Sequence, residues 1–172
     1  SDYTLFKDTV GKSPDSVVAH EKYGTALIER NQLDEAIGHL RTAITLDYSS
    51  DEAHTNLGIA YYKKGMIDQA IEEERISIKI NPNLPEKHFN LAQQLADKNL
   101  WEAAIPEYEI AIGLDPNFAD AYNGLGFSYA MIGSIDKAIE QFGIAVRLAP
   151  ENPMYRKNMA RAQEMKKEAS GS

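Results

Sequence analysis

A repeat with a period of 34 residues runs through the chain and limits what it can fold into. The segment Asp-Glu-Ala-Ile and its variants start at four positions in strict register: Asp34, Asp68, Glu102 and Asp136. Prolines keep the same step at three positions: Pro82, Pro116 and Pro150. A repeat of this length indicates supersecondary units that bury their apolar faces against their neighbours in a stack. Such a chain favours an extended binding surface over a catalytic pocket.

Each unit has the pattern of two amphipathic helices joined by a tight turn. In residues 119–152, Tyr122, Leu125 and Tyr129 recur at helical spacing, and Phe142 lies on the apolar face of a second helix. Glycine or asparagine, the residues that most readily take positive φ, stands at the end of each first helix: Asn31, Gly65, Asn99 and Gly133. The pattern predicts eight repeat helices, at residues 17–30, 34–47, 51–64, 68–80, 85–98, 102–114, 119–132 and 136–148.

The two ends of the chain carry further helical patterns. Residues 2–12 place Tyr3, Phe6 and Val10 on one face, which fits the second helix of a truncated repeat or a cap. Residues 153–168 read as a half-polar helix that covers the exposed face of the last repeat. The first residue is Ser, and residues 170–172 read Ser-Gly-Ser, so we expect a piece of a longer protein with a short tail left by cloning.

In these features the sequence resembles four tandem tetratricopeptide repeats. The resemblance covers residues 17–152 and includes small residues at one place in each first helix: Gly24, Gly58, Ala92 and Gly126. It implies an all-α fold, a right-handed α-solenoid (superhelix) of stacked antiparallel helix pairs. The expected divisions are an N-terminal helix or truncated repeat, four repeats, a C-terminal capping helix and a tail: residues 1–16, 17–50, 51–84, 85–118, 119–152, 153–169 and 170–172.

Composition narrows the classes of partner and site. The net charge is −8, so the chain repels phosphate backbones and we expect no nucleic-acid partner. The absence of cysteine excludes disulfides and thiolate metal sites. No apolar run reaches the ~20 residues of a membrane span, so we expect no direct membrane insertion. The compartment stays open: the cytoplasm is the default expectation, and a membrane-tethered parent protein is the alternative.

Three histidines recur in the repeat register: His20, His54 and His88. A metal site is an unsuitable explanation, because equivalent positions of stacked repeats lie on the order of 10 Å apart, whereas Zn–N bonds are about 2 Å long. We therefore expect these rings to pack between helices, and we expect His39 to be isolated and exposed. No residue pattern indicates a catalytic, cofactor or metal site, and we expect no enzymatic activity.

Glu74 is an irregularity in the apolar pattern. The equivalent residues are Leu40, Tyr108 and Phe142, all of which suit a buried slot. A carboxylate there either turns out to solvent beside Arg75 or weakens the packing of the second repeat.

The resemblance also implies a concave groove lined by the first helix of each repeat. The family's groove positions give these candidate peptide-binding residues: Thr55, Asn56, Ile59, Tyr62, Phe89, Asn90, Gln93, Asn123, Phe127, Met131, Lys157, Asn158 and Arg161. The apolar members either form an exposed interaction patch or are partly buried against neighbouring helices. The cations of a carboxylate clamp are missing from the family's slots, so the resemblance implies no receptor for an acidic peptide end.

A row of asparagines lies within this set, at Asn56, Asn90 and Asn158, with Gly124 interrupting it. An amide donates and accepts at once, so it can pair with the backbone of an extended ligand of any sequence. The row resembles the asparagine ladder of the superhelical domain of O-GlcNAc transferases. The alternative is that asparagine is simply common at this position of the family.

We therefore predict a non-enzymatic scaffold that binds a peptide segment of a partner protein in its concave groove. One alternative is a homo-oligomer formed by stacking or exchange of the terminal helices. Another starts from the stretch Leu5 to Pro14, which resembles the lead-in to repeat arrays appended to bacterial membrane glycosyltransferases. That resemblance implies a partner-recruiting appendage of a larger enzyme.

Overall fold

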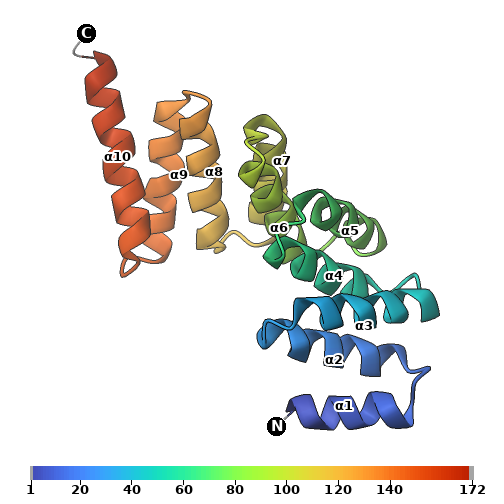
Figure 1. Ribbon diagram of the computed structural model, residues 1–172. Helices are drawn as coiled ribbons and strands as arrows, with labels where there is room; N and C mark the ends of the chain where they lie inside the picture. Colours follow the sequence, from blue (N-terminus) through green and yellow to red (C-terminus); the bar gives the residue numbers. More distant parts are fainter. Residues whose placement is uncertain (1, 171–172) are drawn as a thin grey trace. The chain divides into compact units, whose positions relative to one another are not determined.

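The computed structural model describes residues 2–170, and this part of the chain forms ten helices and no strand. The helices are α1 (Asp2–Lys12), α2 (Val17–Glu29), α3 (Leu33–Leu46), α4 (Asp51–Lys63), α5 (Ile67–Ile80), α6 (Pro85–Asp97), α7 (Trp101–Leu114), α8 (Ala119–Met131), α9 (Ile135–Leu148) and α10 (Pro153–Ser170) (Figure 1). Both ends of every helix lie within two residues of the predicted ones. α10 includes Ser170 of the expected tail, whereas residues 171 and 172 of that tail lie outside the described residues.

The chain divides into two compact units, residues 1–82 and 83–172. The first unit holds α1 to α5 and the second holds α6 to α10. Within each unit, helices that follow one another in the chain pack side by side and reverse direction at each short turn (Figure 1). The all-α solenoid class predicted from the repeat is thus confirmed. None of the helices in residues 2–170 is long and apolar enough to cross a bilayer.

The tight turn inside each helix pair depends on a residue in the left-handed region. The four residues predicted for this role all have positive φ: Asn31 at 58°, Asn99 at 59°, Gly65 at 78° and Gly133 at 78°. Glycine lacks the Cβ that clashes in this conformation, and asparagine tolerates it better than most residues. The second helix of each pair therefore starts at the same place in each repeat.

A cluster of buried side chains forms the core of the first unit, with Tyr23, Leu27, Leu40, Leu57 and Tyr61 as its largest members. Three half-buried residues of α1 pack against this cluster: Tyr3, Phe6 and Val10. The Tyr23 hydroxyl lies 3.3 Å from that of Tyr3, and the Arg30 guanidinium lies 4.5 Å from the centre of the Tyr3 ring. The N-terminal helix thus docks on its own chain.

Small residues let the two helices of a pair approach closely. A Cβ on Gly24 would lie 2.7 Å from Leu40 Cγ, and one on Gly126 would lie 2.8 Å from Phe142 Cδ1. Both distances are shorter than real Cβ contacts, so a larger residue there would push the helices apart. The small residues at these two places of the repeat therefore let the paired helices approach closely.

Glu74 does not turn out to solvent, and that alternative was wrong. Its side chain is fully buried, and a Cβ on Gly58 would lie 3.3 Å from Glu74 Oε2. The carboxylate therefore fills the slot that Leu40 and Phe142 fill in their own repeats. The missing Cβ of Gly58 leaves room for this carboxyl group.

The last helix docks on the last repeat, in the place expected for a cap. α10 packs against α9 and α8, and its buried residues are Tyr155 and Ala162. The Tyr155 hydroxyl donates a hydrogen bond of 2.5 Å to Asp120 Oδ1 of α8. Of the three residues that the repeat register places on the contact face of this helix, Ala162 is buried, Met159 is half-buried and Ala160 is exposed.

Candidate functional site

The histidine row joins the two helices of the first three pairs. His54 Nδ1 lies 2.6 Å from Glu73 Oε2, and His88 Nδ1 lies 2.7 Å from Glu107 Oε2. Both rings are buried, as the packing interpretation predicted. In residues 2–170, no three His, Asp or Glu side chains gather as metal ligands. The row is best understood as structural.

His39 takes the place of the glutamate in the first repeat, and the prediction that it is isolated was wrong. Its Nδ1 lies 2.9 Å from His20 Nδ1, and its ring centre lies 4.7 Å from that of Tyr23. Burial lowers the pKa of His39, and the neighbouring His20 lowers it further, while Glu35 opposes the shift. His20 and His39 are 19 residues apart, as are His54 and Glu73. This recurring spacing could have predicted the contact between His20 and His39.

The candidate groove residues of the first unit make contacts within that unit. Thr55 Oγ1 lies 2.7 Å from Ser77 Oγ, and the Asn56 amide donates to Thr25 Oγ1 at 3.2 Å. Ile59 and Tyr62 are half-buried against the core cluster. For these two apolar residues the structure agrees with the partial-burial alternative.

In the second unit, Phe89 is also half-buried. Its ring centre lies 4.8 Å from that of Phe118 and 6.0 Å from that of Tyr108. Its neighbour Asn90 is half-buried and Gln93 is exposed. Phe89 therefore stabilises the packing of its own unit and offers little surface to a ligand.

Two asparagines of the predicted row, Asn56 and Asn158, donate hydrogen bonds to neighbouring first helices. The Asn158 amide of α10 donates to Asn123 Oδ1 of α8 at 2.9 Å, just as Asn56 of α4 donates to α2. Each amide thus uses one of its two N–H groups inside the protein. Within residues 2–170, the carbonyl oxygen and the second N–H of these two side chains make no hydrogen bond, and the ladder stays a prediction.

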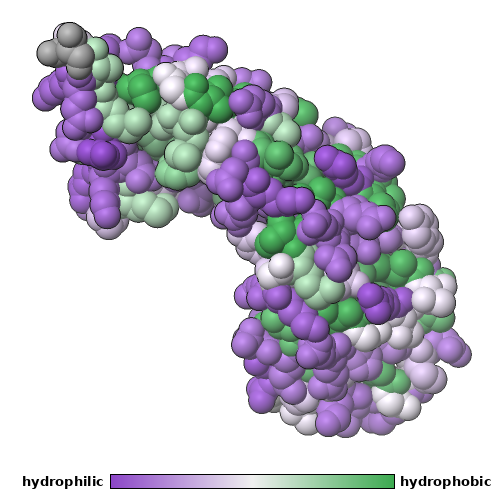
Figure 2. Space-filling model, turned by 45° about the horizontal axis from the view of Figure 1, so that its top comes forward, coloured by the Kyte–Doolittle hydropathy of each residue, from purple (hydrophilic) through white to green (hydrophobic). Residues whose placement is uncertain are grey.

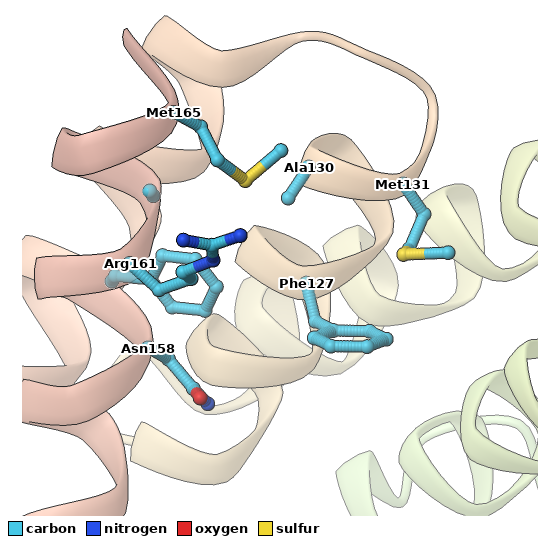
Figure 3. Close-up of a pocket in the computed structure, with 8 residues that line it drawn as sticks. Phe127, Ala130, Met131, Asn158, Arg161 and Met165 are labelled. Atoms are coloured by element: carbon cyan, nitrogen blue, oxygen red, sulfur yellow. The ribbon is translucent and has the colours of Figure 1, made fainter. Parts of the chain in front are cut away.

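Four of the candidate groove residues come together around one cavity of about 220 Å³ in the second unit: Phe127, Met131, Asn158 and Arg161. The cavity lies between α8 and α10, and its lining is completed by Ala130, Phe142, Ala162 and Met165. Figure 3 shows Arg161 and Met165 extending from α10 towards α8. The side chains of Phe127 and Met131 are 45% and 51% exposed. Apolar surface also lies beside the end of α10 in Figure 2.

Two residues that the sequence reasoning missed lie at or near this cavity. Met165 follows Arg161 by four residues, so helical spacing could have placed it on the same face. The Trp101 ring lies edge-on to Phe127 with the ring centres 5.7 Å apart. Trp101 begins α7, a second helix, so the projection of first-helix positions could not include it. The candidate Lys157 is exposed one turn before Arg161 and does not line the cavity.

Sequence comparisons agree with the architecture. The model of a family described as TPR repeat matches residues 24–65 and 92–133, and one described as tetratricopeptide repeat matches residues 51–84. The chain is a tetratricopeptide repeat protein. Repeats of this family are generally non-enzymatic protein-interaction modules, and no catalytic family is indicated for this tetratricopeptide repeat chain. No curated protein matches it.

Solved structures share the fold of this tetratricopeptide repeat protein. YrrB, described as a TPR protein with an unusual peptide-binding site, is 20% identical with a TM-score of 0.82, over 94% of this chain and 84% of its own. MamA from Desulfovibrio magneticus RS-1 is 22% identical with a TM-score of 0.83, over 88% and 85%. A thermophilic TPR protein of Thermus thermophilus is 19% identical with a TM-score of 0.73, over 94% and 88%. At these identities the likeness establishes the fold alone.

Proposed function

We propose that this tetratricopeptide repeat protein is a scaffold that holds an apolar side chain of a partner polypeptide in the cavity between α8 and α10. The observation that carries the proposal is the exposure of Phe127 and Met131 at the edge of a cavity whose other walls are mostly apolar. Large apolar side chains gathered at a surface mark interaction sites. An occupant that covers them gains roughly 25 cal/mol for each Å² of apolar surface removed from water.

The size of the cavity favours one anchor residue of a longer segment. At about 220 Å³ it is smaller than the pockets of roughly 300–1,000 Å³ that enclose small molecules. A single leucine, methionine or phenylalanine side chain fits such a space, and the rest of the segment lies along the surface. We expect modest affinity, on the order of micromolar, as for transient interfaces.

We place the proposed contact in the second unit and not along the whole row of first helices. Ile59, Tyr62 and Phe89 are half-buried in their own units, whereas Phe127 and Met131 are 45% and 51% exposed. An apolar anchor therefore gains most at the cavity between α8 and α10. The residues Asn90, Gln93 and Asn123 stay candidates for polar contacts with the flanking backbone.

A random peptide display library selected on the protein tests the proposal. Peptides recovered on the wild type should bind the Phe127→Ala/Met131→Ala variant at least tenfold more weakly, because about 1–2 kcal/mol of apolar contact is lost at each anchor. The control is Ile110→Ala/Leu114→Ala, which removes exposed apolar surface of α7 away from the cavity. Unchanged affinity in the cavity variant, with its helix content intact, would reject the proposal.

Two broader predictions remain separate from this site. Self-association through the terminal helices is tested by sedimentation at several protein concentrations. A partner-recruiting role in a larger membrane glycosyltransferase is tested by the coding sequence that surrounds this segment.

A further inference from the structure

The distribution of charge in the second unit bears on what the cavity binds. Residues 83–152 carry 10 acidic and 4 basic side chains, whereas residues 153–172 carry 2 acidic and 5 basic ones. All of these basic residues lie on α10, the helix that forms one wall of the cavity. The part of this unit with net positive charge is therefore a helix that borders the apolar cavity.

We infer, on the basis of the function proposed above, that the bound segment is acidic. It places an apolar anchor in the cavity and Asp or Glu side chains beside the anchor, on Arg161 and Lys157. The chemistry of recognition is an apolar contact together with charge-assisted hydrogen bonds.

Arg161 is the cation that lines the cavity itself. Its guanidinium extends from α10 towards α8 in Figure 3, where an anchored segment would pass. Its ion pair with Glu164, at 3.3 Å, joins two side chains that are 65% and 63% exposed. A pair this exposed contributes little, so a carboxylate of a ligand can replace Glu164. A carboxylate that meets Arg161 at the edge of an apolar cavity is less screened than one in open solvent.

Lys157 lies one helical turn before Arg161, on the same face of α10. It is exposed, and it has no ion pair within residues 2–170. Other cations of this helix are engaged, since Lys166 pairs with Asp136 at 2.6 Å and Arg156 donates to the Pro150 carbonyl at 3.0 Å. Arg161 and Lys157 are thus the two cations near the cavity that are open to a ligand.

The spacing of these two cations suggests the pattern of the ligand. Residues four apart on a helix are separated by about 6 Å along its axis. Side chains two apart in an extended peptide are separated by about 6.6 Å. A segment running along α10 therefore meets Lys157 and Arg161 with alternate side chains, and its apolar anchor lies in the cavity that Arg161 lines. The expected pattern is two acidic residues separated by one residue of any type, with the apolar anchor close to the acidic residue that meets Arg161.

The probes are C-terminally amidated peptides taken from the display selection, each paired with a copy in which Gln or Asn replaces its Glu or Asp residues. On the wild type, the acidic form should bind at least tenfold more tightly than its amide copy. On Lys157→Gln/Arg161→Gln the two forms should bind equally. The matched control, Arg147→Gln/Lys167→Gln, removes the same charge from α9 and α10 outside this cavity and should preserve the preference.

The possible outcomes distinguish a failure of this inference from a failure of the proposed function. Equal binding of acidic and amide peptides that still depend on Phe127 and Met131 overturns the inference and leaves the proposed function standing. Peptides whose affinity is unchanged in Phe127→Ala/Met131→Ala overturn both the inference and the proposed function. Affinity that requires a free C-terminal carboxylate, but no internal Asp or Glu, contradicts the acidic pattern. A further outcome is that the protein alone forms a dimer, which Lys157→Gln/Arg161→Gln converts to monomer. That result would show that the occupant is a second copy, and it would also overturn the inference.

Discussion

The ring of Tyr108 fills the space beside Gly124, where a Cβ would lie 2.5 Å from Tyr108 Cζ. Tyr108 belongs to α7 and Gly124 to α8, and these helices pack against each other. Gly124 occupies the position at which Asn56 and Asn158 stand in other first helices. The asparagine row is therefore broken at α8 by the packing of a neighbouring helix.

Completing the row should harm the protein. We predict that Gly124→Asn lowers the free energy of unfolding by about 1–3 kcal/mol, because the added side chain must displace the Tyr108 ring. Gly113→Asn is the control, since a Cβ on Gly113 in α7 meets nothing within 4 Å. It should stay within about 0.5 kcal/mol of the wild type. Urea unfolding of both variants measures these free energies. Equal stability of the two variants would contradict the prediction and mean that the Tyr108 ring moves aside at little cost.

The stability of the first unit should depend on pH through His39. Its pKa is lowered from the ordinary value of 6.5, first by burial and then by His20. Below 6.5 the unfolded chain therefore holds more protons at His39 than the folded chain, so this contribution to stability is present at higher pH and is lost as the pH falls through the folded pKa. Urea midpoints at pH 7.5 and 5.5 should differ more for the wild type than for His39→Gln. An equal difference would contradict the prediction.

Restoring the pattern of the other repeats should stabilise the first one. We predict that His39→Glu raises the free energy of unfolding by about 1 kcal/mol at neutral pH, because a carboxylate can accept from His20 as Glu73 accepts from His54. The free energy of unfolding of this variant should also fall less at acidic pH than that of the wild type, because the variant lacks the His20–His39 contact. A drop in stability would show that the nearby Glu35 repels the new carboxylate more than His20 attracts it.

The attachment of α10 should depend on the hydroxyl of Tyr155. Burial and the bonded Asp120 raise the pKa of Tyr155 to about 12, so the group donates its proton over the neutral range. Tyr155→Phe should cost about 0.5–1.5 kcal/mol. It should also speed hydrogen exchange in α10, which forms a wall of the cavity. Tyr48→Phe, at a residue that is 64% exposed, is the control and should change neither quantity.

The helices and turns were predictable from the sequence because their signals are local and recur. Asn31 and Gly65 identify the turns by residue type alone, and the 19-residue spacing of His54 and Glu73 would have identified the His20–His39 contact. Exposure in the groove was not predictable in this way. Phe89 is half-buried partly because Phe118, just before α8, packs on it.

The position of Phe118 is Ser50 and Leu84 in the other repeats, so the periodic pattern carries no information about this contact. The contact between Trp101 and Phe127 was not predicted for a similar reason. The candidate groove residues were taken from first helices only, and Trp101 begins a second helix. Local periodicity thus predicts which helix a residue occupies. Contacts between residues that do not recur decide which side chains remain exposed for a partner.

Methionine methyl resonances offer the most direct test of binding at the cavity between α8 and α10. Met131 and Met165 line this cavity, whereas Met66 belongs to the first unit and serves as an internal reference. In a protein labelled with ¹³C at the methionine methyls, a peptide recovered from the display selection should shift the Met131 and Met165 signals and leave Met66 in place. A peptide that binds while both cavity methionines keep their shifts would contradict the proposed site.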